Sequence, residues 1–493
     1  MTGSALDHAR RQSDLRRLRD EVPDVLVVGG GATGAGVALD AAARGLSVAL
    51  VDKLDLAAGT SRWSSKLAHG GLRYIAAGQL GVAWESVVER NHLVRRIAPH
   101  LVQPMRFVIP ALPSNGALEH VAGRLGFGIA DAMRVAARTP AAFPATRWAD
   151  ARRTRELVPA LRADVRGSFV HVDGALEDDA RLVVALARTA AEHGARIVTH
   201  CRATDVTAGG AVLEDTLTGD RFDVRARVVV VAAGVWSGGL VEGVPLQPSK
   251  GAHLLIRADA VGRPAASFNI MVPGTRNRFV FAVPRPDGTV QVGLTDDAVD
   301  DVVDEPPVTD ADERFLLETL SSGLSTDVRD DDVIGRFAGL RPLLGRAHGT
   351  SAADLSRRHA LLDRDGTLVI VGGKLTTYRR MAQDTVDRVV QRLGRGGRCP
   401  TTTLPLAGAG TPTSPGRLGR RFGVEAAAVA ACGPQEPIAP GVPALKCEVG
   451  WAVQAEGAVT PDDVARRLRL DLVPEWHEAA RGYIDEVLSA APS

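Results

Sequence analysis

The sequence predicts an α/β fold in three parts: a glycine-rich strand–helix–strand unit, an antiparallel β layer and a helical C-terminal region. The first part rests on residues 24–52, where two apolar runs flank a glycine turn and an alanine-rich segment. The second rests on two alternating runs within 279–296, joined by Pro-Asp-Gly at 286–288. The third rests on the helical periodicity of 417–493.

Composition limits the class of protein. The chain has 493 residues, enough for two or three domains, and its net charge of +1 gives no global field that favours nucleic acid. No run approaches the roughly 20 apolar residues of a membrane span, and the first twenty residues lack the apolar core of a signal peptide. The four cysteines show neither metal-site spacing nor a disulfide framework. We expect a reduced cytoplasmic protein without a metal site.

The first unit reads as strand, turn, helix and strand. Residues 25–28 are β-branched and too short a run for a helix, so a buried strand is predicted. After the glycine turn, a helical pattern continues to Arg44. A second apolar run, 47–51, then closes on Asp52, which stands at the tip of the second strand.

The turn carries Gly29, Gly31 and Gly34 in the spacing G-x-G-x-x-G. Such glycines let a pyrophosphate approach the backbone, and the following helix N-terminus presents free N–H groups to it. Asp52 is placed to accept hydrogen bonds from an adenosine ribose. The motif alone is weak evidence, but between two strands and with an acid about twenty residues on it is strong. It favours a bound dinucleotide over a glycine-rich turn of ordinary structure.

Residues 53–75 interleave hydroxyl, glycine and basic residues with large apolar ones, which favours a segment packed against a ligand over a solvated loop. Helical patterns follow at 78–100 and 116–138. The second is basic and amphipathic, typical either of a membrane-surface helix or of a helix packed on its own domain. A helix at 178–194 and a strand within 225–239 return to the first unit.

Residues 246–300 predict the antiparallel layer, which is placed to roof a substrate site, and the acidic run 296–305 predicts a solvated loop. Residues 333–380 return to the first unit, with a strand, a Gly-Gly turn and a helix within 368–390. We expect these domain boundaries: a discontinuous dinucleotide-binding domain of residues 22–98, 165–245 and 333–393, a substrate or cap domain of 99–164 and 246–332, and a helical domain of 400–493.

Several blocks resemble the FAD-dependent (respiratory, GlpD-type) glycerol-3-phosphate dehydrogenases. They are VVGGGATGAG (27–36), GTSRWSSKLAHGGLRY (59–74), APHLVQPMRF (98–107), DDARLV (178–183), KGAH (250–253), GLRPL (339–343), GGKLTTYR (372–379) and, more loosely, VTPDDVARRLRL (459–470). The resemblance implies a Rossmann-like FAD domain of the glutathione-reductase type with a β-sheet cap. Three departures stand out: Arg62-Trp63 where small residues are usual, Arg285 where an aromatic is frequent, and a short C-terminal domain.

The resemblance also implies a reaction, the oxidation of sn-glycerol 3-phosphate to dihydroxyacetone phosphate, with hydride passing to flavin N5 and electrons to a quinone. For the substrate phosphate we expect Arg73, Arg341 and Lys374 as cations, with Tyr74 and Thr377 as neutral partners. An ion pair of purely structural role stays an alternative for Arg341.

For the base that removes the alcohol proton we favour His253, with His69 as its rival, because an imidazole titrates near neutrality. His253, Arg341 and Lys374 are therefore the predicted catalytic residues. The predicted FAD contacts are Gly29, Gly31, Thr33, Gly34, Asp52, Thr60, Ser64, Ser65, Lys66, Leu67, His69, Gly70, Ala233, Gly234, Gly373, Lys374, Leu375 and Thr376.

Two other functions stay open. One is an oxidase that uses oxygen directly, such as a glycerophosphate oxidase or an amine-oxidising relative, although the cations suit a phosphate better than an ammonium. The other is a non-catalytic FAD-binding regulatory protein. A peripheral contact with the inner face of the plasma membrane and a homodimer are also left open, whereas a nucleic acid partner is not expected.

Overall fold

The computed structural model describes residues 3–76, 78–113, 117–275, 278–345, 358–412 and 414–490. Its first sheet has six strands in the order β18-β19-β11-β1-β2-β7. Neighbouring strands are parallel except β18 and β19. The strands are β1 (Val25–Val28), β2 (Val48–Val51), β7 (Arg196–Val198), β11 (Val228–Val231), β18 (His359–Arg364) and β19 (Thr367–Gly372).

Both faces of this sheet are covered, which explains why its central strands are continuous apolar runs. One face packs against the helices α2 (Ala32–Ala43), α7 (Asp179–Glu192) and α10 (Tyr378–Leu393). The other packs against α1 (His8–Asp20) and a three-stranded sheet of β8 (Cys201–Thr207), β9 (Gly210–Asp215) and β10 (Arg221–Arg225). The predicted α/β class is confirmed.

The second sheet follows the path β16-β12-β15-β14-β13-β4-β6-β3, with β17 beside β12 and β5 beside β6. It is antiparallel, as predicted, apart from the pairing of β13 with β4. Its strands are β3 (Leu67–Ala68), β4 (Val102–Pro110), β5 (Arg147–Asp150), β6 (Gly167–Leu176), β12 (Leu246–Arg257), β13 (Ser267–Met271), β14 (Phe279–Pro284), β15 (Thr289–Gly293), β16 (Asp297–Ala298) and β17 (Val333–Leu344). The helices α6 (Ala151–Leu157) and α9 (Asp310–Ser321) pack on it.

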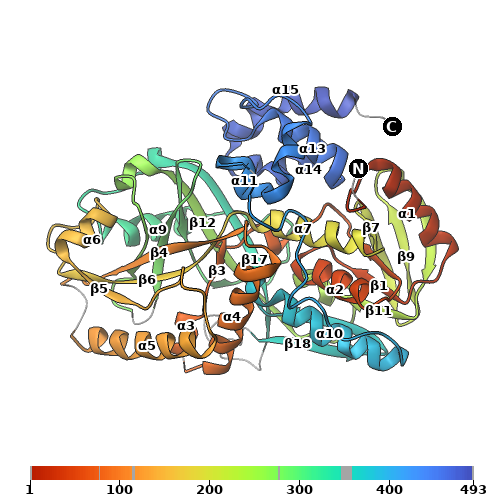
Figure 1. The fold of residues 1–493 in the computed structure, drawn as a ribbon, viewed down its shortest axis with the longest axis horizontal. Helices are drawn as coiled ribbons and strands as arrows, with labels where there is room; N and C mark the ends of the chain where they lie inside the picture. The colour runs from red at the N-terminus through yellow and green to blue at the C-terminus, as the bar shows by residue number, and fades with distance from the viewer. Residues whose placement is uncertain are drawn as a thin grey trace.

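Figure 1 places the two sheets side by side, with α3 (Leu72–Ala76), α4 (Leu80–His92) and α5 (Ala117–Ala136) along the lower edge of the view. The C-terminal helices lie at the opposite edge, above the junction of the sheets. They are α11 (Gly416–Phe422), α12 (Ala426–Ala430), α13 (Lys446–Glu456), α14 (Pro461–Leu468) and α15 (Pro474–Ala490), and they enclose apolar clusters of their own.

Some details differ from the sequence-based expectation. The helix α1 and the strand β18 were not predicted, because neither shows a clear apolar period. The acidic run 296–305 is mostly exposed, but the expectation of a solvated loop is wrong for Asp296, whose side chain is 7% exposed. Among the described residues, no helix is long and apolar enough to cross a membrane.

Candidate active site

A cavity of about 1240 Å³ runs between the two sheets. The first sheet contributes the turn between β1 and α2 and the tip of β2. The loop 58–65 and the turn 372–376 line its middle, and the second sheet contributes His253 and Arg341. Segments far apart in the sequence therefore meet in one space.

The glycine turn exposes bare backbone to this cavity. Gly29 has a φ of +115°, and a Cβ on it would lie 2.6 Å from the Ala232 carbonyl oxygen. A Cβ on Gly34 would lie 1.8 Å from the Gly29 carbonyl oxygen, so only glycine lets α2 approach the turn. Gly31 caps α2 without a side-chain hydrogen bond. The Ala32 N–H at the start of this helix donates to Ser61 Oγ at 2.9 Å. The helix N-terminus lies in the cavity wall, where it suits an anion such as a pyrophosphate.

Asp52 is fixed at the rim of the same cavity. One carboxylate oxygen accepts the Gly30 N–H at 2.6 Å, and the other accepts the Leu54 N–H at 2.8 Å. Carboxylate oxygens accept more than one hydrogen bond each, so Asp52 keeps capacity for ribose hydroxyls. A bare glycine turn, a helix N-terminus in the cavity wall and an oriented acid together fit FAD.

His253 lies in β12, with its ring in the cavity wall and only 2% of the residue exposed. Its Nε2 lies 3.2 Å from Ser65 Oγ, and its ring stacks on Phe337 at a centroid distance of 4.8 Å. Burial, followed by the charges of Arg341 and Lys66, lowers the pKa of His253 well below its ordinary value. The imidazole is therefore neutral near pH 7, the form in which it accepts a proton.

Two predicted cations flank the cavity. Arg341 pairs with Asp296 at 3.0 Å, and its second terminal nitrogen donates to the Thr295 carbonyl at 3.1 Å. The Lys374 ammonium lies over the Tyr74 ring, 4.2 Å from its centroid, and donates to Ser86 Oγ at 2.5 Å. Asp296 offsets part of the positive charge, and it keeps the Arg341 fork oriented in the absence of a substrate anion.

His69, the rival base, also lines the cavity. Its Nδ1 accepts the Gly71 N–H at 3.2 Å, and its ring stacks on Tyr74 at 5.9 Å. Next to it, Asp173 accepts the Gly70 N–H at 2.8 Å and pairs with Arg90 at 2.7 Å. Both histidines thus lie in the cavity wall, and the His253 ring nitrogen Nε2 is held against the Ser65 hydroxyl.

The structure brings most of the predicted site residues into this wall. They are Gly29, Gly31, Thr33, Asp52, Thr60, Ser64, Ser65, Leu67, His69, Tyr74, Ala233, Gly234, His253, Arg341, Gly373, Lys374, Leu375 and Thr376. The Arg73 side chain lies outside the described part of the structure, so its predicted phosphate contact is not described.

Four predicted residues are placed elsewhere. Gly34 packs behind the turn, and Gly70 donates its N–H to Asp173. Thr377 is buried and its hydroxyl donates to the Lys374 carbonyl at 3.2 Å, so it supports the turn beneath that lysine. Lys66 points into a second, smaller cavity and pairs with Asp179 at 3.3 Å.

The cavity residues that the sequence-based prediction missed include Asp173, Arg278 and Asp296. Asp296 is the first residue of the acidic run, and its proximity to Arg341 depends on the pairing of β12 with β17. Arg278 directly precedes β14, and nothing in the spacing around it indicates a site. Asp173 meets the Gly70 N–H because β6 pairs with β3, and this long-range pairing leaves no local signal in the sequence.

Two of the departures have structural reasons. Arg62 is buried, pairs with Asp471 and Glu305, and stacks on Trp63 at 3.7 Å. Trp63 stacks in turn on Phe337 at 5.4 Å, and it lines the cavity. Arg285 extends to the carbonyl oxygens of Leu176 and Glu177, so it closes the hairpin over the end of β6.

Fold and cavity define an oxidoreductase class that binds a flavin dinucleotide. The sequence pattern described as FAD dependent oxidoreductase matches residues 24–388. The chain is 46% identical to "Glycerol-3-phosphate dehydrogenase 1" of Mycobacterium tuberculosis over 99% of both chains. It is 32% identical to "Aerobic glycerol-3-phosphate dehydrogenase" of Staphylococcus aureus, over 82% of this chain and 74% of that protein.

A solved structure gives the same result. The glycerol-3-phosphate dehydrogenase from Bacillus halodurans complexed with FAD superposes with a TM-score of 0.75 at 26% identity, over 98% of this chain and 94% of that one. The chain therefore belongs to the FAD-dependent oxidoreductase family and, within it, to the glycerol-3-phosphate dehydrogenases. It is an enzyme whose cofactor is FAD.

Proposed function

We propose that this cavity oxidises sn-glycerol 3-phosphate to dihydroxyacetone phosphate. One observation carries the proposal: a neutral buried imidazole, His253, faces the same space as the cations Arg341 and Lys374 and the glycine turn. When bound, FAD supplies the acceptor for the hydride that leaves C2 of the substrate. The relatives named above carry this substrate in their names, which supports it.

The cations would bind the phosphate. Arg341 offers a planar fork, which suits two phosphate oxygens, and Lys374 offers a compact charge. Tyr74, stacked under the Lys374 ammonium, fixes the position of that charge. We propose Arg73 as a third cation on its sequence position, and Thr377 as a residue that acts through the Lys374 backbone.

His253 would take the proton of the C2 hydroxyl. Its Nε2 already shares a hydrogen bond with Ser65 Oγ at 3.2 Å, so the ring orientation is fixed before substrate binds. Stacking on Phe337 holds the ring plane. His69 stays the alternative base, because it lines the same cavity.

For the electron acceptor and the location we propose a quinone at the inner face of the membrane. In support, the helix α5 exposes Leu125 and Val135, with 69% and 65% of these residues accessible, next to the exposed Arg124. Exposed apolar side chains on an amphipathic helix are the feature that inserts into a membrane interface. Two further expectations stay predictions. They are a homodimer and the division into a dinucleotide-binding domain (22–98, 165–245 and 333–393), a substrate or cap domain (99–164 and 246–332) and a helical domain (400–493).

The test is a visible spectrum of the purified protein before and after anaerobic addition of sn-glycerol 3-phosphate. Bleaching of the flavin bands is expected with this compound and not with glycerol or with an amine such as glycine. Bands that persist with sn-glycerol 3-phosphate but bleach with an amine would overturn the substrate. Reoxidation by a soluble quinone, compared with reoxidation by oxygen, then separates a quinone-linked dehydrogenase from an oxidase.

A further inference from the structure

The turn that joins α14 to α15 presses against the loop that carries Ser64 and Ser65. Leu472 and Val473 of this turn pack with Leu255 and Phe337 of the second sheet. At Gly335, a Cβ would lie 2.2 Å from the Leu472 carbonyl oxygen, so the two backbones touch. The C-terminal helices therefore reach the wall of the active-site cavity.

Arg469 forms a polar part of this contact beside the ion pair of Arg62 with Asp471, and the Arg469 side chain is 7% exposed. Its two terminal nitrogens donate to the Arg62 carbonyl oxygen at 3.1 and 3.0 Å, and one also pairs with Asp179 Oδ1 at 2.7 Å. The residue has a φ of +65°, a left-handed conformation that a non-glycine side chain adopts only when its surroundings compensate. The fork of one arginine thus joins the loop to α7.

Asp179 passes this contact on to Ser64. Its Oδ2 accepts the Ser64 hydroxyl at 2.7 Å and the Ser64 N–H at 3.0 Å, while Oδ1 binds Arg469. Lys66 also lies 3.3 Å from the same carboxylate. The backbone next to Ser65, and with it the hydroxyl that meets His253, is therefore set by the carboxylate that Arg469 orients.

A second route is aromatic. The Arg469 guanidinium lies 5.7 Å from the Trp63 ring centroid, and Trp63 stacks on Phe337. Phe337 in turn stacks on His253 with ring planes only 11° apart. Both routes run from the same arginine to the same histidine.

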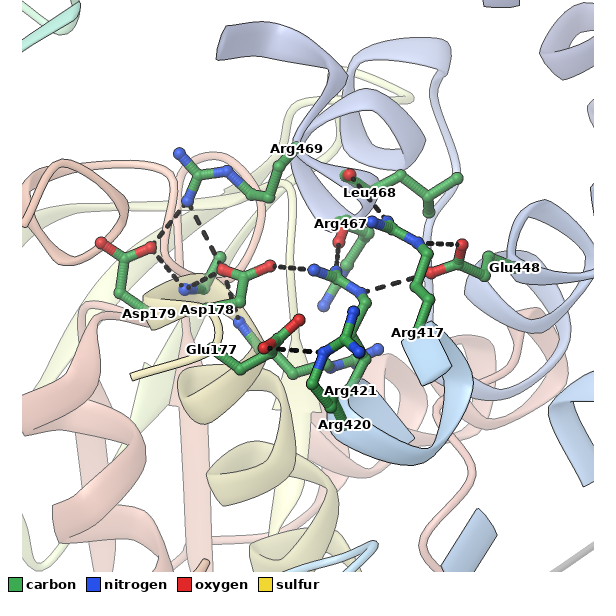
Figure 2. Close-up of polar contacts among 12 residues, drawn as sticks. Glu177, Asp178, Asp179, Arg417, Arg420, Arg421, Glu448, Arg467, Leu468 and Arg469 are labelled. Carbon is green, nitrogen blue, oxygen red and sulfur yellow. Dashed lines mark hydrogen bonds and ion pairs between the residues drawn. The ribbon is translucent and has the colours of Figure 1, made fainter. Parts of the chain in front are cut away.

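The far end of the contact is anchored rigidly. Figure 2 shows a ladder of ion pairs that leads from Asp179 and Arg469 through Asp178 to Arg421 and Glu448. Asp178 meets Arg421 at 2.8 Å, and both residues are buried. Burial alone would raise the pKa of Asp178, but the charges of Arg421 and Arg469 hold this pKa well below its usual range. Asp178 therefore stays ionised at neutral pH. A different orientation of the Arg469 side chain would break its ion pairs with Asp178 and Asp179.

We propose that Arg469 of the C-terminal helical unit is a positioning residue for the oxidation, holding the loop 62–66 and, through it, the orientation of His253. This role rests on the proposed function of His253. In this proposal the C-terminal helical unit contributes to the active-site wall, although it lies outside the two sheets.

The test compares Arg469→Met with Arg188→Met. Arg188 is a matched control, because it is also buried and joins α7 to the C-terminal unit through Glu425 at 2.7 Å, but it does not touch the loop 62–66. Two quantities are measured: backbone hydrogen exchange of peptide 62–68 without substrate, and the rate of anaerobic flavin reduction at saturating sn-glycerol 3-phosphate. Flavin reduction by Arg469→Met should be roughly 10- to 100-fold slower, with faster exchange in 62–68.

Arg188→Met should lose thermal stability but keep both properties. Unchanged exchange and an unchanged reduction rate in Arg469→Met would overturn the proposal. If Arg469→Met does not fold, Arg469→Lys is measured instead, since it keeps the positive charge but loses the planar guanidinium. A wild-type rate of flavin reduction and wild-type exchange of peptide 62–68 in Arg469→Lys would contradict the positioning role. Wild-type flavin that sn-glycerol 3-phosphate does not bleach would instead refute the proposed function, and the exchange measurement would still test the loop.

Discussion

The chemistry of the site depends most on His253, whose environment keeps the imidazole neutral. His253→Gln should slow anaerobic flavin reduction by about 10²–10⁴-fold, because it removes the proton acceptor, while the dissociation constant of sn-glycerol 3-phosphate changes little. His69→Gln is the matched comparison. Stopped-flow reduction of both variants decides between them: a large loss in His69→Gln and a normal rate in His253→Gln would move the base to His69.

The same environment has a consequence for stability. Burial and the charge of Arg341 lower the pKa of His253 in the folded chain, whereas an unfolded chain titrates near its usual value of about 6.5. Below about pH 6.5 His253 binds a proton in the unfolded chain but not in the folded chain. His253 therefore lowers the free energy of unfolding in acid, and it has no such effect above about pH 6.5. Thermal melts from pH 7.5 to pH 5 should show a smaller acid loss in His253→Gln than in wild type. An identical loss would contradict the shifted pKa.

Arg341 is the residue proposed to bind the substrate phosphate with its planar guanidinium. Arg341→Ala should raise KM for sn-glycerol 3-phosphate roughly 10- to 100-fold, since a charged hydrogen bond to the phosphate is lost and the charge of Asp296 is no longer offset by Arg341. Arg336→Ala, on the same strand but with an exposed side chain that pairs with Glu313, is the control and should keep its KM. Steady-state kinetics with an artificial acceptor measure both. An unchanged KM in Arg341→Ala would reduce that residue to a structural ion pair.

Among the elements, the β1–α2 turn leaves no space for a side chain at Gly34. Gly34→Ala places a methyl group 1.8 Å from the Gly29 carbonyl oxygen, and we expect a loss of at least about 1–3 kcal/mol of stability together with bound FAD. Gly482→Ala, in the exposed face of α15 with open space around it, should gain up to about 1 kcal/mol. Thermal melts and the flavin absorbance per protein give both numbers. Full FAD content in Gly34→Ala would show that the close packing is not required.

The helix α5 carries the prediction about the membrane. Leu125→Ser combined with Val135→Ser removes two exposed apolar side chains from one helix, so co-sedimentation with anionic vesicles should fall severalfold. Leu217→Ser is the control, since Leu217 is also exposed but lies near the three-stranded sheet of β8–β10. Equal sedimentation of wild type and the double variant would exclude α5 as the docking element.

At the scale of the whole molecule, local elements were predictable and long-range contacts were not. The apolar run 25–28 and the glycine turn specify β1 and α2 within a residue or two, because burial and backbone conformation act locally. The hairpin at 286–288 was equally clear, and Gly288 has the positive φ that such a turn needs. These features were enough to predict the α/β class and the antiparallel layer.

The site was harder, because its walls come from distant segments. Ser249 lies opposite Arg341 because of the register between β12 and β17. The acidic run contains no pattern that distinguishes Asp296, whose side chain lies beside this arginine, from its exposed neighbours. Lys66 is predicted to contact the cofactor from its motif, yet it lines another cavity. Burial and the charge of Arg469 lower its pKa there to about 8. Charges that pair across 290 residues, as Arg469 and Asp179 do, leave no periodic signal.

The most direct test of the account is a single anaerobic turnover with sn-glycerol 3-phosphate that carries deuterium at C2. If hydride leaves C2 for the flavin in this cavity, the flavin bands bleach more slowly with the deuterated compound than with the ordinary one, and one dihydroxyacetone phosphate forms for each flavin reduced. Bleaching at equal rates without dihydroxyacetone phosphate would contradict the proposed chemistry.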